Sequence, residues 1–248
     1  ARAMSSMSTA SPRSSSETSA EHPLRALLWV LALIVVIWQL PYGRSILYPF
    51  SLLATCAHEL GHGLTALLVG GEFSSFALYA DGSGLALWRG TGGRLSTALV
   101  AAGGPLGPSI AGSLLILLAR SSRQARVMLW LVAGGLLAVV VVWARNPFGV
   151  IFLVACALFF AAVALWLGDR AVTFVLRLTG ALLCLSWLQD LDYLFTSSAV
   201  IGGLRHASDT TVIAQALWLP YWFWGGVIAL ISLAVLALGL RLATRPRR

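Results

Sequence analysis

Two histidines and a glutamate lie within the short stretch HELGH, inside a segment that is otherwise apolar. His58 and His62 are four residues apart, so on a helix they project from one face and both imidazoles can reach one cation. Glu59 lies on the adjoining edge, where its carboxylate can take a proton from an attacking water molecule. An ionisable group in hydrocarbon costs roughly 3 kcal/mol or more, so it is seldom there without a function. The pattern predicts a zinc hydrolase site; the alternative is a polar cluster that only packs helices together.

A catalytic zinc ion usually has three protein ligands and one open position, so two histidines are not sufficient. Most acidic residues are poorly placed to complete the site, because they lie in the N-terminal tail, beside an arginine in a joint, or in an expected hairpin. Asp190, Asp192 and Asp209 remain. The first two lie near the end of an apolar run, CLSWLQDLDYLF, and we expect one of them to be the third ligand. They are two residues apart, so on a helix only one faces the metal easily.

The composition is that of a polytopic membrane protein. Of the 248 residues, 58% are hydrophobic and 10% are charged, and the mean hydropathy is +0.86, which is too apolar for an ordinary water-soluble domain. The formal net charge of +8 does not indicate a nucleic-acid partner, because the arginines lie at the ends of apolar runs and in the tail RLATRPRR. We expect these arginines to anchor and orient the spans.

Apolar runs long enough to cross a bilayer predict an all-α fold of about six or seven transmembrane helices. The expected spans are about 24–40, 47–69, 95–119, 127–143, 148–167, 172–195 and 217–240. They form one membrane-embedded domain, 23–241, between a disordered tail, 1–22, and a basic tail, 242–248. The count of arginines favours the joint RSSRQAR and the C-terminal tail on the cytoplasmic side, which an odd number of spans would pair with an external N-terminus. If the broken segment AAGGPLGPS is re-entrant instead, the count becomes even and this topology changes.

A β-hairpin is expected between the second and third spans, at about 73–89. There, in GEFSSFALYADGSGLALWRGTGG, two apolar runs flank the turn signal DGSG. Unpaired strand edges are not tolerated against lipid, so the hairpin must lie at the interface or line a cavity. It either presents an edge strand to an extended substrate or packs as a lid over the cavity.

Several of these features together resemble the site-2 protease family of intramembrane zinc metallopeptidases, in its short bacterial B-like branch. They are HELGHG in a span, the hairpin after it, AAGGPLGPS in the next span, a late Asp, and SDTTVIAQALWLPYWFWGG. The resemblance covers roughly residues 47–235. The chain departs from better-known members in lacking a PDZ-like insertion and a clear N-x-x-P-x-x-x-L-D-G stretch.

The resemblance implies a role for each site residue. Zinc is expected on His58, His62 and Asp190, with Glu59 as general base and acid, and Asp209 is the reserve ligand because it matches a Ser-Asp that recurs in the branch. It also implies a multi-pass protein of the bacterial plasma membrane, in contact with the lipid bilayer, whose partner is a membrane-protein substrate with a transmembrane helix.

Two other functions use the same residues without proteolysis. A metal transporter needs polar residues on several spans, yet the fourth and fifth runs contain no charges. A catalytically inactive metal-binding scaffold has no need of a base at Glu59. A hydrolase of other esters or amides is a third possibility, and nothing in the chain selects its substrate.

Overall fold

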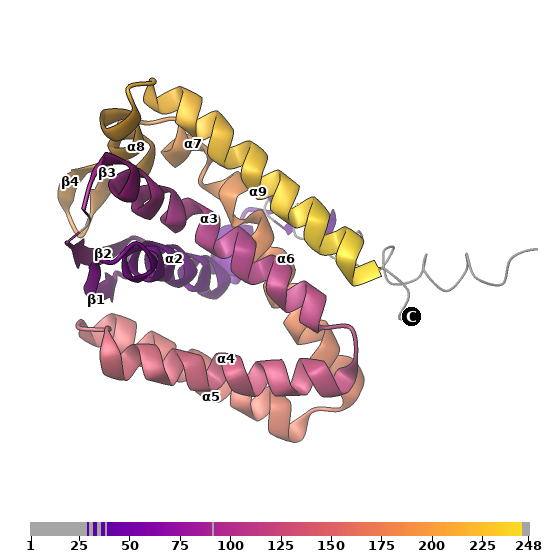
Figure 1. Cartoon of the computed structure of the whole chain (residues 1–248). Coiled ribbons are helices and arrows are strands. Elements are labelled where there is room, and N and C mark those ends of the chain that lie inside the picture. The colour runs from indigo at the N-terminus through magenta and orange to yellow at the C-terminus, as the bar shows by residue number, and fades with distance from the viewer. Residues whose placement is uncertain (1–28, 30–31, 34–35, 38, 91, 245–248) are drawn as a thin grey trace, which may run out of the picture.

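The computed structural model describes residues 29–244, apart from 30–31, 34–35, 38 and 91. Most of it is helical (Figure 1). The helices are Gly43–Leu68 (α2), Arg94–Leu118 (α3), Ser122–Val142 (α4), Pro147–Trp166 (α5), Asp169–Gln189 (α6), Leu191–Leu194 (α7), Asp209–Leu217 (α8) and Tyr221–Thr244 (α9). The strands are Glu72–Leu78 (β1), Gly84–Arg89 (β2), Ser198–Ile201 (β3) and Leu204–Ala207 (β4).

The prediction of an all-α polytopic membrane protein is confirmed. Among the described residues, five helices are long and apolar enough to cross a membrane, namely α3, α4, α5, α6 and α9. The helix α2, which has 26 residues and carries the HELGH motif, is not one of the five. The expected first span, 24–40, and the N-terminal tail lie largely outside the described residues.

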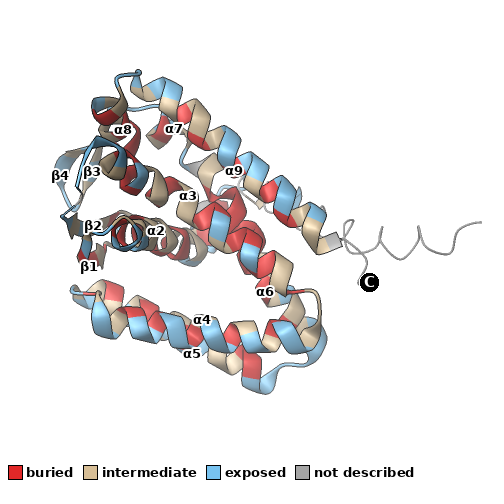
Figure 2. Cartoon of the chain, viewed as in Figure 1, coloured by how far each residue is buried: buried red, intermediate tan, exposed pale blue. Residues whose placement is uncertain are grey.

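Much of the outward surface of the helices is exposed (Figure 2), and it carries many large apolar side chains, which suits a lipid environment. In α4 and α5, Leu131, Ile151 and Leu158 are each at least 60% exposed, and Trp166 at the end of α5 is 80% exposed. Large contiguous apolar surfaces are rare on soluble monomers and are expected where lipid tails replace water. Figure 1 shows α4 and α5 side by side, on the far side of α2 from α9.

The helix α3 runs unbroken through Pro105 and Pro108, so the alternative of a re-entrant segment at AAGGPLGPS is wrong. Its glycines serve close packing against α2. A Cβ atom placed on Gly61 of α2 would lie 2.1 Å from the carbonyl oxygen of Gly103. Small residues of this kind let two helix backbones approach in a membrane. The glycines flanking His62 are therefore packing residues; the second, Gly63, lies against the ring of Phe73.

The predicted hairpin forms from β1 and β2, which pair antiparallel. The outer edge of β1 is covered: the N–H of Phe76 donates to the carbonyl of Trp143 (3.0 Å), and the N–H of Arg145 donates to the carbonyl of Phe76 (3.2 Å). The side chain of Asn146 bonds both backbone groups of Leu78. No described strand pairs with the opposite edge, on β2. The hairpin therefore has one covered edge and one open edge.

A second antiparallel hairpin, β3–β4, was not predicted. Its strands meet at Gly202 and Gly203, which both have positive φ (55° and 84°). Both hairpins lie at the same end of the helical bundle, beside α8 (Figure 1). The N–H of Gly202 lies 3.4 Å from the hydroxyl of Ser83, which links the two hairpin tips.

Candidate metal centre

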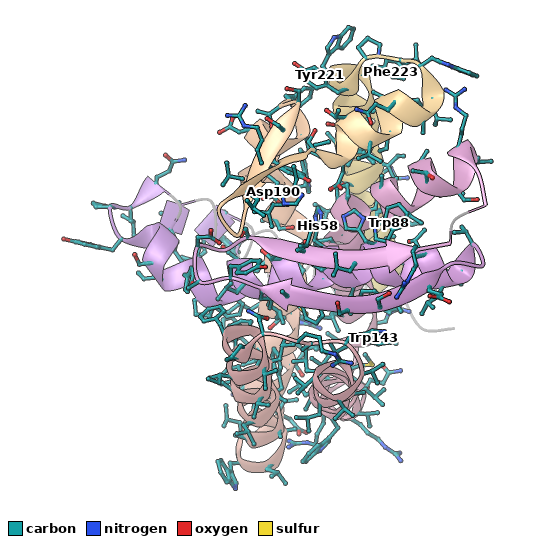
Figure 3. All side chains as sticks on the ribbon, turned by 90° about the vertical axis from the view of Figure 1, so that its left-hand side faces the viewer. His58, Trp88, Trp143, Asp190, Tyr221 and Phe223 are labelled. Atoms are coloured by element: carbon teal, nitrogen blue, oxygen red, sulfur yellow. The ribbon has the colours of Figure 1, made fainter. Side chains whose placement is uncertain are left out.

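The helix α2 presents the three HELGH side chains at one place, as its spacing predicts. The Nε2 atoms of His58 and His62 lie 3.2 Å apart, and the two rings meet edge to face. Glu59 and His62 are buried, at 6% and 7% exposure. Figure 3 shows His58 on the side of the β1–β2 hairpin away from Trp143. Two nitrogen donors and a carboxylate are thus held in a nearly dry environment.

Asp209 completes the group. Its Oδ2 atom lies 3.0 Å from Nε2 of His58, and its Oδ1 atom lies 3.2 Å from Nε2 of His62. One donor atom from each of the three residues lies within 4.8 Å of the others, so together they could hold a metal ion. Two imidazoles and one carboxylate are a donor set found at catalytic zinc, with a fourth position left for water or substrate. The residues present therefore fit zinc.

Asp190 and Asp192 are not part of this group, so the geometry favours Asp209, the reserve ligand, over Asp190. The expectation rested on one continuous helix to about residue 195. Instead α6 ends at Gln189 and Asp190 lies at its C-cap, followed by the single turn of α7. The chain then forms the second hairpin, and α8 begins at Asp209 beside the histidines.

The position of Asp209 is set by local capping. Ser208 is the N-cap of α8, and its hydroxyl accepts a hydrogen bond from the N–H of Thr211 (3.3 Å). The same hydroxyl donates to the carbonyl of Thr196 (2.6 Å). Ser208 and Thr210 are fully buried, so the helix N-terminus is fixed. The run SDTT contains this N-cap signal, which is visible in the sequence.

His62 is oriented from its other ring nitrogen. Its Nδ1 atom lies 2.7 Å from the carbonyl oxygen of Val100 in α3. A carbonyl only accepts, so Nδ1 carries a proton and Nε2 is the nitrogen left to bind a metal. Gly104, one helical turn further along α3, leaves room for that nitrogen. A Cβ atom there would lie 2.2 Å from Nε2 of His62 and 2.8 Å from Nε2 of His58.

Tyr193 is a site residue that the sequence analysis missed. Its hydroxyl donates to Oδ2 of Asp209 (2.9 Å) and accepts from the N–H of Asp209 (3.3 Å). Its ring meets that of His58 edge to face. Nothing in the spacing LDYL marked this tyrosine, because the short helix α7 and the return to α8 decide where it points.

The carboxylate of Asp209 is held in its ionised form. Burial by itself would raise the pKa of this group, but the imidazoles of His62 and His58, when protonated, hold it well below its usual range. A metal ligand must be deprotonated. Burial also raises the pKa of the Tyr193 phenol well above its usual value, so the phenol remains a hydrogen-bond donor to Asp209.

Glu59 faces the open edge of the β1–β2 hairpin. The backbone N–H of Ala86 donates to its carboxylate. Gly84 lies so near that a Cβ atom there would be 2.7 Å from Oε1 of Glu59. The strand β2 therefore runs directly over the general-base candidate.

Two cavities of ≈ 230 Å³ each meet at the site, and both are lined by His58, Glu59, Gly84, Tyr193 and Ile201. The first extends past Asp190 toward the turn of the first hairpin and toward β3. The second contains His62 and Asp209 and extends along β2 to Trp88 and across to His206. The open edge of β2 thus borders cavities on both sides of Glu59.

Residues 26–239 match a family model described as Peptidase M50B-like. No curated protein and no solved structure matches the chain. The match spans the helical bundle, both hairpins and the whole cluster of His58, Glu59, His62 and Asp209.

Proposed function

Because the chain belongs to the Peptidase M50B-like family, which is the site-2 protease family, we propose that it is an intramembrane zinc metalloprotease. It would hydrolyse peptide bonds in or near a transmembrane segment of a membrane protein. The observation that carries the proposal is the convergence of His58, His62 and Asp209 beside Glu59, within a bundle of membrane-spanning helices. Zinc, when bound by these three residues, supplies an acidic water near neutral pH and a Lewis acid for the peptide carbonyl.

Glu59 is the proton carrier in this proposal. Its carboxylate takes a proton from the attacking water and later delivers it to the nitrogen of the leaving amine. Glu59 is buried, and the N–H of Ala86 donates to its carboxylate and orients it. Tyr193 and the Val100 carbonyl hold Asp209 and His62 in place.

The open edge of β2 is the proposed binding strand for substrate. Phe76 and Ala86 are register partners, and the backbone groups of Phe76 point away from β2 toward Trp143 and Arg145. In an antiparallel ladder, the backbone groups of two partner residues point either both toward each other or both away from each other. The N–H and C=O of Ala86 therefore face the open edge of β2. A helical substrate must unwind before hydrolysis, because its carbonyls are hydrogen-bonded. Strand addition along β2 would hold the unwound segment beside Glu59.

The remaining expectations follow from membership in the membrane-protease family. We propose a membrane-protein substrate with a transmembrane helix, and residence in the bacterial plasma membrane. Against a transporter, α5 contains no charged residue, and α4 contains none from Val127 onward. The Glu59 carboxylate argues against a metal-holding scaffold, because a base beside the ligands and under β2 is not needed to hold the metal.

The proposal is tested with purified protein in lipid vesicles, using a model substrate that has one transmembrane helix. The wild type is expected to hold zinc and to cleave. Glu59→Gln is expected to hold the same zinc but to cleave at least a hundredfold more slowly, since the amide keeps the shape and loses the proton acceptor. Equal cleavage by the two proteins would refute the protease mechanism, and absence of cleavage by the zinc-loaded wild type would favour the scaffold.

A further inference from the structure

Asp190 is an acidic side chain at the site that the proposed mechanism does not use. It lines the first cavity together with His58 and Glu59, and Figure 3 shows it beside His58, on the same side of the β1–β2 hairpin. Both Asp190 and its companion in the sequence, Asp192, are exposed, but Asp192 lines neither cavity. Of the two acids near the end of α6, only Asp190 therefore borders the site.

The carboxylate of Asp190 is unpaired within the described part of the chain. No hydrogen bond or ion pair joins it to any residue that the structure describes, and no Arg lines the cavity. Burial among protein atoms raises its pKa, which His58 partly offsets and the charge of Asp209 adds to. The residue is nevertheless exposed, and its exposed side chain borders the cavity. A cation that entered the cavity could form a charge-assisted hydrogen bond with this unpaired carboxylate.

The rest of the cavity suits a cationic side chain. Hydroxyl groups of Ser51, Thr55, Ser83 and Ser186 line it, and hydroxyls can accept hydrogen bonds from an ammonium or guanidinium group. Its ≈ 230 Å³ far exceeds the roughly 10–15 Å³ that one water molecule needs on this scale. Gly82 and Gly84 form its border on the hairpin side, at the start of the open edge of β2.

We propose that the Asp190 cavity is a substrate subsite that takes a Lys or Arg side chain next to the scissile bond. The inference rests on the proposed function, because it needs a peptide extended along β2. A residue held near Gly84 would direct its side chain past Glu59 to Asp190. The protease would then prefer substrates with a basic residue near the cleavage point, which is an unusual position for a charge in a transmembrane segment.

The test is cleavage of matched substrates that carry Arg, Gln or Glu at each position flanking the cleaved bond. The wild type should cleave the best-placed Arg substrate about tenfold faster, in kcat/KM, than the matched Gln substrate. Asp190→Asn should lose this ratio and keep its zinc and its rate on the Gln substrate. Asp190→Arg should reverse the preference toward Glu. Asp192→Asn, a matched control outside the cavity, should behave as the wild type.

The same peptides are also tested for binding to Glu59→Gln and to Glu59→Gln/Asp190→Asn, where hydrolysis is absent. If Glu59→Gln binds the Arg peptide more tightly than the Gln peptide, and Glu59→Gln/Asp190→Asn does not, the subsite is supported even when no substrate is cleaved. The subsite and the protease function can therefore fail separately. Equal ratios for wild type and Asp190→Asn would overturn the subsite. Loss of zinc in Asp190→Asn would overturn it as well, because the residue would then belong to the metal centre.

Discussion

The hydroxyl of Tyr193 donates a hydrogen bond to Oδ2 of Asp209 (2.9 Å) and accepts one from the backbone N–H of the same residue (3.3 Å). Two bonds to one residue fix both the carboxylate and the start of α8. Groups that orient a metal ligand typically change metal affinity by 10- to 100-fold when they are removed. Tyr193 is thus a positioning residue that acts through Asp209.

Tyr193→Phe should lower zinc affinity by about 10- to 100-fold while the protein still folds. The ring and its contact with His58 remain, and only the hydroxyl is lost. Competition with a chelator of known affinity measures the change, and saturating zinc should restore cleavage. Tyr42→Phe is the control, because Tyr42 is 76% exposed. Unchanged zinc affinity in Tyr193→Phe would remove the positioning role.

The identity of the third ligand is tested by metal content. Asp209→Ala should lose most bound zinc, because only two imidazoles remain and catalytic zinc usually needs three protein ligands. Asp190→Ala and Asp192→Ala should keep it. Metal analysis of the three purified variants after dialysis decides between them. Zinc loss in Asp190→Ala with retention in Asp209→Ala would restore Asp190 as the ligand.

The parts of the site that the sequence revealed are those fixed by local geometry. His58, Glu59 and His62 share one helix, so their spacing alone placed them together, and the first hairpin followed from its turn residues. Asp209 is 151 residues from His58, and no periodicity reaches that far. The sequence favours Asp190 because a carboxylate near the end of an apolar run needs a function there, whereas in the structure α6 ends at Gln189 and Asp190 lies at its C-cap. The second hairpin had a signal in its Gly202–Gly203 turn, a pair that suits positive φ.

Gly104→Ala should abolish zinc binding although it is a conservative change in a helix. Its Cβ atom would lie 2.2 Å from Nε2 of His62, so the ligand atom or the α2–α3 contact must shift. Gly134→Ala in α4 is the matched control, since nothing lies within 4 Å of a Cβ there, and an added methyl in a helix favours stability by up to about 1 kcal/mol. Thermal unfolding and zinc content are measured on both. Normal zinc in Gly104→Ala would mean that the imidazoles are more mobile than the packing implies.

The last prediction separates a substrate-binding strand from a lid. The register assigns the N–H groups of Leu85 and Leu87 to the ladder with β1, because these residues alternate with Gly84 and Ala86 along the strand. Proline at Leu85 or Leu87 would therefore damage the hairpin itself, whereas proline at Ala86 removes an N–H from the open edge. Ala86→Gly keeps that N–H and is the matched control.

Since the Ala86 N–H also bonds Glu59, its role in substrate binding must be measured without hydrolysis. In the Glu59→Gln background, Ala86→Pro should weaken binding of an extended substrate peptide about tenfold, because it removes the N–H that the added strand would take over from residue 59. Ala86→Gly should bind within about twofold of the parent, and zinc content should be equal in all three, since the metal ligands lie on α2 and α8. Equal peptide affinity for the Pro and Gly variants would make the hairpin a lid that packs over the cavity and takes no part in holding the substrate backbone.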